Sequence, residues 1–166
     1  MKAGRAVDLG ESAVEPWGLA GDRRWLLVDE DGRFVSQREE SALARVVVRY
    51  GPAAGAISVS ADGLPARRID LPAQGAQLLK VTVWDSALLA AAAGPAADQW
   101  FRAYLGRPVR LVYLDDPTRR PVDPEPLKML GLRRRFGQEL VFGQNLIPDS
   151  GGVIRAGDAV EVLQTA

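Results

Sequence analysis

The chain has 166 residues, of which 47% are hydrophobic and 25% charged, the balance of one globular domain of ordinary size. Lys and Arg number 21, as do Asp and Glu, so the net charge is zero and no overall field attracts nucleic acid or an anionic membrane. The sequence has no cysteine and no histidine. This double absence excludes disulfides, zinc sites built on thiolate or imidazole, and nucleophiles activated by histidine.

Arginine supplies nearly all of the basic residues, with Lys2, Lys80 and Lys128 as the only lysines, and alanine and glycine are abundant. Such a composition is typical of a GC-rich bacterial genome. The N-terminus lacks the charged and then apolar pattern of a signal peptide, and the run from Ala87 to Ala93 is too short to cross a bilayer. We therefore expect a cytoplasmic protein that contacts neither membrane nor nucleic acid.

Short strands are predicted throughout the first two thirds of the chain. Residues 24–28 and 33–36 flank the acidic turn Asp29-Glu30-Asp31-Gly32, a pattern that predicts a hairpin whose glycine takes a positive φ. One helical turn is expected at residues 39–43. Further strands, each bounded by turn residues, are predicted at residues 45–50, 56–60, 67–71, 79–84 and 109–114.

A single segment, residues 96–105, is predicted to be an α-helix. Pro95 suits the first turn, and Gly106 suits the C-terminal cap. Apolar residues recur between them at helical spacing, which gives one stripe that faces a core. The stripe consists of Ala97, Trp100, Phe101, Tyr104 and Leu105. The four tryptophans, Trp17, Trp25, Trp84 and Trp100, are all expected in the core.

The composition changes at residues 115–126, which hold four prolines and almost nothing apolar. This segment is predicted to be a linker between an N-terminal unit, residues 1–114, and a C-terminal unit, residues 127–166. In the second unit a short basic helix is expected at residues 127–135, followed by two strands, 140–147 and 153–163, that form a hairpin. The expected fold class is thus mainly β: an antiparallel barrel with one α-helix and a short C-terminal β hairpin.

Several motifs follow one another in a fixed order between residues 4 and 124, and they cover roughly three quarters of the chain. The motifs are residues 15–29, Ser36-Gln37-Arg38, Val83-Trp84-Asp85, Trp100-Phe101, residues 105–112 and Arg120-Pro121-Val122-Asp123-Pro124. Together they resemble the N-terminal β-barrel domain of the MOSC (molybdenum cofactor sulfurase C-terminal) family. A second segment, Phe142-Gly143-Gln144-Asn145-Leu146 followed by residues 152–163, resembles the last strands of the MOSC domain itself.

The resemblance implies a molybdenum cofactor, molybdopterin, held between two domains and ligated by a cysteine of the MOSC domain. Full-length relatives of this kind include bacterial N-hydroxylated-base reductases and the mitochondrial amidoxime-reducing component. This chain has no cysteine, and its linker leads directly into residues that resemble the far side of the missing ligand. We expect that the middle of the MOSC domain is absent, and that the Lys-Ser-Cys-like motif before the barrel is cut short.

The resemblance also implies cofactor-binding residues, for which the candidates are Arg23, Arg38, Gln37 and Lys2. From the residues alone, Arg23 is a surface arginine paired with Asp22, whereas the resemblance implies that its guanidinium contacts the pterin phosphate. Lys2 is a candidate replacement for the motif lysine, although its register is shifted in the alignment that we favour.

Gln37 and Arg38 are expected to end the second strand of the hairpin, near Arg23 across it. A pair of cross-strand arginines favours an anion between them. The alternative is a solvated strand end with Glu39 and Glu40 as counterions. Period-two alternation places Arg24 on the face opposite Arg23.

We favour the interpretation of this chain as a truncated, non-catalytic MOSC-family module related to molybdenum-cofactor oxidoreductases. The alternative is an active molybdopterin oxidoreductase that reduces N-hydroxylated substrates, but without a thiolate the metal loses its protein ligand. A Schiff-base enzyme needs a lysine in a desolvated pocket, and no pattern in the sequence indicates one.

Apolar faces of the C-terminal strands predict that the tail packs on its own barrel or pairs in a homodimer, with exposure the least favoured outcome.

Overall fold

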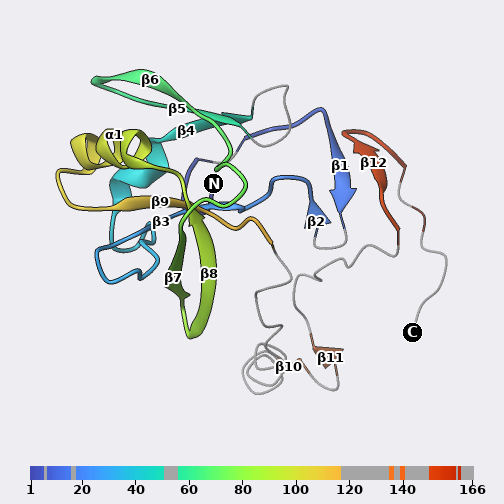
Figure 1. Cartoon of the computed structure of the whole chain (residues 1–166). Coiled ribbons are helices and arrows are strands. Elements are labelled where there is room, and N and C mark those ends of the chain that lie inside the picture. Colours follow the sequence, from blue (N-terminus) through green and yellow to red (C-terminus); the bar gives the residue numbers. More distant parts are fainter. Residues whose placement is uncertain are drawn as a thin grey trace.

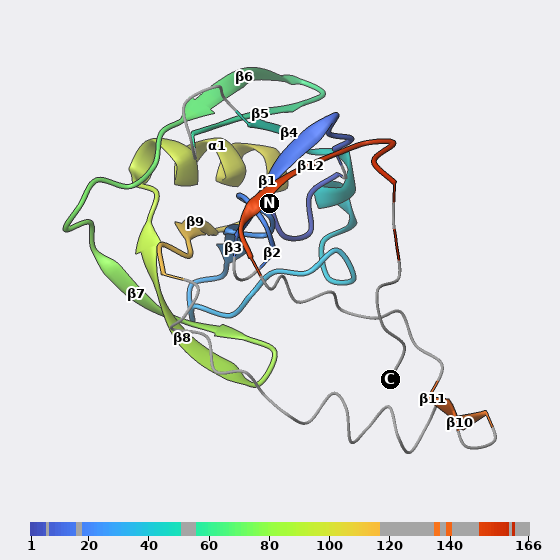
Figure 2. The same ribbon diagram turned by 90° about the vertical axis from the view of Figure 1, so that its right-hand side faces the viewer.

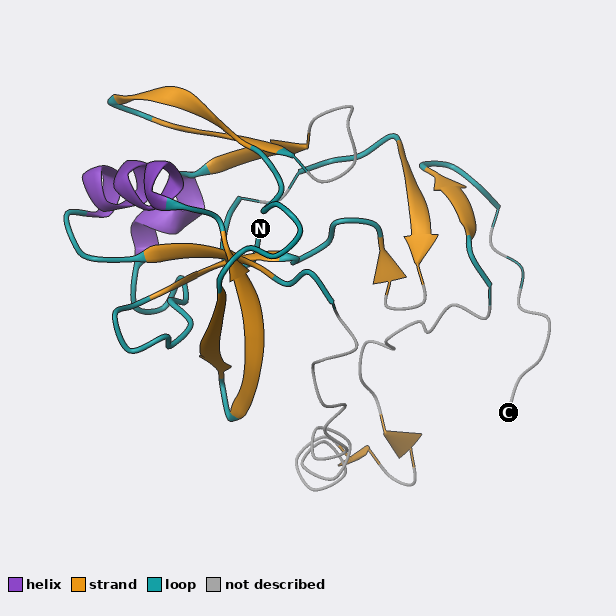
Figure 3. Ribbon diagram, viewed as in Figure 1, coloured by secondary structure: helices purple, strands orange, loops and turns teal. Residues whose placement is uncertain are grey.

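The computed structural model describes residues 1–5, 7–15, 18–50, 56–116, 135–136, 139–140, 150–159 and 161. These residues are mainly β with one α-helix, as predicted (Figures 1 and 3). In chain order, the elements are β1 (Glu11–Glu15), β2 (Gly18–Leu19), β3 (Trp25–Val28), η1 (Ser41–Arg45), β4 (Val47–Tyr50), β5 (Ile57–Ala61), β6 (Leu64–Ile69), β7 (Leu78–Val83), β8 (Ser86–Ala92), α1 (Pro95–Leu105), β9 (Arg110–Tyr113), β10 (Arg135–Phe136), β11 (Glu139–Leu140) and β12 (Gly152–Arg155).

The centre of the fold is an antiparallel sheet with the strand order β3-β9-β8-β7. Strand β3 is buried along its whole length, because its apolar residues alternate between two cores. Trp25 and Leu27 enter the larger core, whereas Leu26 and Val28 enter the smaller one. Because both faces of β3 are buried, all four of its residues are apolar, whereas other strands of the fold have one face in solvent.

Helix α1 lies between the central sheet and a second antiparallel sheet, β4-β5-β6 (Figure 2). Its predicted stripe is confirmed, since Ala97, Trp100 and Phe101 are buried in the larger core. Trp100 Nε1 also donates a hydrogen bond to the Pro65 carbonyl of β6 at 2.8 Å. Pro95 begins the helix, and Gly106 ends it with a left-handed φ of 65°.

The predicted turn at residues 29–32 forms. Asp29 Oδ1 accepts from the backbone N–H groups of Asp31 and Arg33, at 3.0 and 2.8 Å. Gly32 has a φ of 78°, and a Cβ there would lie 2.6 Å from the Lys80 carbonyl oxygen. No other residue fits this position, because both the positive φ and the close approach exclude a side chain.

The return strand predicted at residues 33–36 is wrong in its extent. The chain after the turn makes isolated bridges, Val28 with Phe34 and Arg33 with Thr82, and then leaves the sheet. Likewise, the predicted helical turn at 39–43 is a 3-10 helix displaced to Ser41–Arg45, because the Glu40 carboxylate caps the N–H of Ala42.

Two further predictions need correction. Strand β8 was not predicted, because an alanine-rich run has little intrinsic preference for a strand, yet it pairs with β7 along six residues. Trp84 was expected in the core but is 58% exposed at the turn between β7 and β8, with a φ of 57°. Trp25 and Trp100 are core residues as expected, and Trp17 lies outside the described residues.

The tail is described at β10, β11 and β12. Strand β12 pairs with β1, and β10 pairs with β11, so Arg135 lies in a strand where the end of a basic helix was expected. Val153 and Ile154 of β12 are 51% and 49% exposed in the single chain, so the barrel does not cover these two side chains; pairing in a homodimer stays a prediction. The predicted linker beyond Asp116, residues 127–134 of the predicted basic helix and most of the predicted strand at 140–147 fall outside the described residues. The strand predicted at 153–163 is wrong in its extent, because β12 ends at Arg155 and a turn follows at Ala156 and Gly157. Within the described part of the chain, no helix is long and apolar enough to cross a membrane.

The first prediction tests the central sheet. Replacement Leu111→Ala, at a fully buried position of β9, is expected to lower the free energy of unfolding by about 2–5 kcal/mol through lost burial and a cavity. The matched variant Leu89→Ala, on an exposed position of β8, is expected to change it by less than about 0.5 kcal/mol. Urea denaturation measures both. Equal losses would show that β9 is not at the centre of the core.

Candidate functional site

The N-terminal segment lies along the start of β3 and carries Lys2, one of the four candidate residues. The Lys2 backbone N–H donates to the Trp25 carbonyl at 2.7 Å, which holds the segment against the sheet. The Lys2 ammonium then lies over two aromatic rings, 5.0 Å from the centroid of Phe34 and 5.9 Å from that of Trp84. This cation–π contact gives the exposed Trp84 a partner and directs the lysine along the sheet.

Gln37 is brought to the same segment, because its Nε2 donates to the Ala3 carbonyl at 3.0 Å. Arg38 is exposed in the turn that follows. The expected strand end opposite Arg23 is therefore wrong. Instead, the Ser36 N–H and hydroxyl donate to one carboxylate oxygen of Glu39, at 2.9 and 3.0 Å, and these hydrogen bonds lower the pKa of Glu39.

Arg23 matches the surface interpretation. Its Nε donates to Asp22 Oδ2 at 2.7 Å, its side chain is 72% exposed, and its φ of 53° places it in a turn before β3. Burial lowers the pKa of the Met1 amino group, and repulsion from the Arg23 guanidinium adds to this shift, so Arg23 lies near the start of the segment that carries Lys2. Of the four candidates, the structure brings together Lys2 and Gln37, whereas Arg23 and Arg38 lie exposed in separate turns.

Arg24, which the sequence did not single out, binds the backbone at the end of β9. Its side chain is 11% exposed, and its Nε and Nη2 donate to the carbonyls of Leu114 and Asp115 at 2.6 and 2.9 Å. The guanidinium also lies 3.7 Å from a Glu15 carboxylate oxygen and over the Tyr113 ring. Arg24 therefore fixes the point at which the chain leaves β9. Period-two alternation did separate it from Arg23, but its partners lie about ninety residues away in sequence.

Tyr50, at the end of β4, contacts the start of the N-terminal segment, because its hydroxyl accepts a hydrogen bond from the Met1 ammonium at 3.3 Å. Its hydroxyl donates to the Gly21 carbonyl at 2.6 Å, and burial raises the pKa of Tyr50 to about 12, with a further contribution from Asp22. Gly21 has a φ of 74°, and a Cβ there would lie 2.9 Å from the Tyr50 ring. Tyr50 thus stays protonated in the physiological range and acts as a hydrogen-bond donor.

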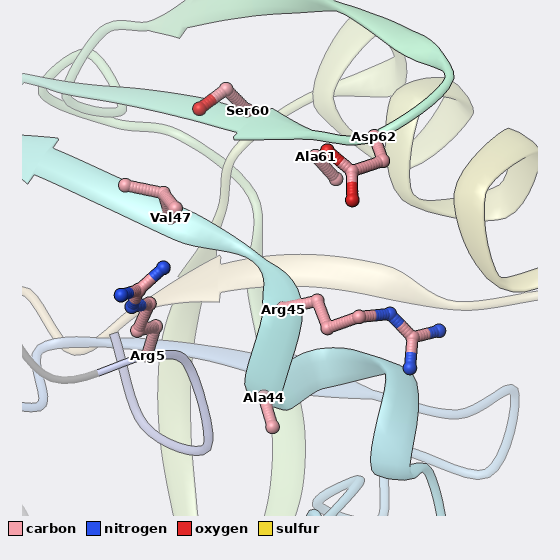
Figure 4. Close-up of a pocket in the computed structure, with 7 residues that line it drawn as sticks. All are labelled: Arg5, Ala44, Arg45, Val47, Ser60, Ala61 and Asp62. Carbon is pink, nitrogen blue, oxygen red and sulfur yellow. The ribbon is translucent and has the colours of Figure 1, made fainter.

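A hollow of about 350 Å³ lies beside the start of β4 (Figure 4). It is lined by Arg5 and Arg45, by the carboxylate of Asp62 and by the hydroxyl of Ser60. In Figure 4 the two arginine side chains extend in different directions, and Asp62 adds a charge of opposite sign. The hollow therefore does not converge on one ligand group. No cluster of three or more metal-binding side chains occurs among the residues that the structure describes.

Comparison with known proteins shows the family of the chain. A family profile described as the MOSC N-terminal beta barrel domain matches residues 1–108. The chain belongs to this family. A solution structure of a protein from Bordetella bronchiseptica has a related fold, with a TM-score of 0.51 and 18% identity over 66% of this chain and 89% of that one. The predicted barrel fold is thus confirmed for the N-terminal part.

Two curated relatives are similar in sequence. The mitochondrial amidoxime-reducing component 1 of Danio rerio is 26% identical over 76% of this chain, and that of Xenopus laevis is 25% identical over 73%. The matched regions are 41% and 37% of the lengths of those proteins. This chain therefore spans about two fifths of the curated relatives that it matches.

The sequence lacks the protein ligand that the resemblance implies for the molybdenum cofactor. That ligand is a cysteine thiolate, and the sequence has no cysteine and no histidine to replace it. Arg23, the candidate for the pterin phosphate contact, is paired with Asp22, and Lys2 lies over the rings of Phe34 and Trp84.

The second prediction compares the two neighbouring arginines. Replacement Arg24→Ala is expected to lower the free energy of unfolding by about 2–3 kcal/mol, because two carbonyls lose a charged donor. Replacement Arg23→Ala, which removes an exposed ion pair, is expected to change it by less than about 1 kcal/mol. Chemical denaturation of both variants measures the difference. The reverse order would show that Arg24 does not anchor the exit from β9.

Proposed function

We propose that this chain is a MOSC-family module that is not catalytic by itself, related to molybdenum-cofactor oxidoreductases. The observation that carries the proposal is the combination of a well-packed N-terminal barrel with a sequence that has no cysteine and no histidine. The fold is retained, but the chain has no cysteine to supply the thiolate ligand that the resemblance implies, and no imidazole to replace it. Its role is that of a scaffold that presents its surface to another protein or to the rest of a larger assembly.

The position of the candidate cations supports the same proposal. A phosphate site needs guanidinium or ammonium groups that converge on one anion, and such groups are most effective when they are held in place. Arg24, the best-held arginine of this region, directs its hydrogen bonds to the Leu114 and Asp115 carbonyls. The exposed Arg23 could release Asp22 and contact a passing anion, which is consistent with weak, exchangeable binding.

The second candidate is an active molybdopterin oxidoreductase that reduces N-hydroxylated substrates. It is favoured by the similarity to amidoxime-reducing components. In this candidate Lys2, Gln37, Arg23 and Arg38 would contact the cofactor. It requires a metal ligand other than sulfur or imidazole from this chain, which makes it the less favoured of the two.

The third prediction separates the two candidates. Protein produced in a host that makes the molybdenum cofactor is expected to contain far less than one molybdenum atom per chain and to show no amidoxime reduction with a reduced viologen as electron donor. A vertebrate amidoxime-reducing component, prepared from the same host, is the positive control. Near-equimolar molybdenum together with turnover would overturn the proposal in favour of the second candidate.

A further inference from the structure

The sheet β12-β1-β2 stands beside the barrel, and its outer strand comes from the far end of the chain (Figures 1 and 2). Strand β12 pairs with β1 over four residues, with Ser12 opposite Ile154 and Ala13 opposite Val153. The Ala156 N–H donates to the Gly10 carbonyl at 2.8 Å, which continues the pairing beyond the strand.

An ion pair sets the register of the two strands. Arg155 Nε lies 3.1 Å from Glu11 Oε2, and the two residues are directly opposite each other. Opposite charges in facing positions favour this alignment, whereas like charges there oppose it. The Asp158 carboxylate accepts from the Arg155 backbone N–H at 2.7 Å and so fixes the turn that follows β12.

No side chain of β12 anchors the strand in a core. All four of its residues are exposed, including Val153 and Ile154. The pairing therefore depends on backbone hydrogen bonds and on one solvated ion pair. A strand held in this way separates from its partner more readily than a strand with a buried face.

The sequence allows the same strand to reach another molecule. Thirty-three residues, 117–149, lie between Asp116 and Ser150 in the sequence. A chain of that length spans at most on the order of 100 Å when fully extended. The net charge of zero does not oppose the approach of two copies. Every copy carries both Glu11 and Arg155, so two copies can satisfy both ion pairs reciprocally.

We propose that β12 exchanges between two copies of this chain, so that Gly152–Arg155 of each copy pairs with Glu11–Val14 of the other. The acceptor is the edge of β1, and the occupant is the same segment that pairs with it within one chain. The exchanged dimer keeps each contact seen in the single chain, which makes it a low-cost form of association. Pairing within one chain competes with pairing between two chains, because each β1 meets its own β12 at a high effective concentration. The fraction of exchanged dimer therefore rises with protein concentration.

The absence of native cysteines allows a direct test by disulfide trapping. Chains with Ser12→Cys are mixed with chains with Ile154→Cys, each marked by a different mass, unfolded, refolded together at high concentration and oxidised. Facing positions of an antiparallel pair suit a disulfide, so exchange is expected to give a linked heterodimer. The matched control mixes Ser12→Cys with Val153→Cys, whose side chain points to the other face of the strand.

The expected result is a several-fold higher yield of heterodimer from the facing pair than from the control pair, by non-reducing electrophoresis and mass spectrometry. Equal yields would overturn the proposal. A chain with both Ser12→Cys and Ile154→Cys, oxidised at low concentration, reports the pairing itself. Failure of this chain to form an internal disulfide would overturn the proposal at its first step, since β12 would then not occupy β1.

Charge exchange gives a second, independent measurement. Glu11→Arg places two arginines opposite each other within one chain, and Arg155→Glu places two glutamates there. Neither variant alone is expected to pair well, but an equimolar mixture restores both ion pairs between chains. Light scattering is expected to show more dimer in the mixture than in either variant, and an unchanged mass on mixing would contradict the exchange.

Discussion

The pairing of β3 with β9 is the interaction on which the rest of the structure depends. Residues 25–28 lie antiparallel to residues 110–113, and both strands are largely buried. Because β3 sends alternate residues into two cores, this pair forms the wall between them. The Lys2 backbone N–H binds the Trp25 carbonyl of β3 and so attaches the N-terminal segment to this pair. At the other end, the Arg24 guanidinium binds the Leu114 carbonyl just after β9. Lys2 and Arg24 are therefore both positioned relative to this pair of strands.

Local patterns predicted those parts of the fold that depend on local contacts. The stripe on α1 and the glycine of the turn at residues 29–32 follow from spacing and backbone sterics, and both are confirmed. Strand β8 was missed because alanines carry no strand preference, although Ala90 and Ala91 are buried by their place in the sheet. Trp84 was misplaced because an apolar residue next to a turn can point either way, and in the structure its ring contacts Phe34 and Lys2 instead of entering a core.

The candidate site shows the same limit more clearly. The family resemblance drew attention to Arg23, whereas the structure holds Arg24, through carbonyls that lie far along the chain. No spacing rule connects Arg24 with Leu114 and Asp115, because the contact exists only once β3 and β9 have paired. Lys2 and Gln37 were brought together by the N-terminal segment, a contact that also depends on tertiary structure. Membership of the MOSC N-terminal beta barrel family thus describes the fold, whereas the positions of the candidate side chains depend on the tertiary contacts of this chain.

A hierarchy of stability follows from this arrangement, with β3 and β9 at the centre and β12 at the margin. Native-state hydrogen exchange of dilute protein tests it most directly. The account predicts that hydrogen-bonded amides of β3 and β9 exchange slowest, through global unfolding, and that those between β1 and β12 exchange much faster, through local opening. Equal protection of the two pairs of strands would contradict it, because β12 would then be an integral part of the folded core.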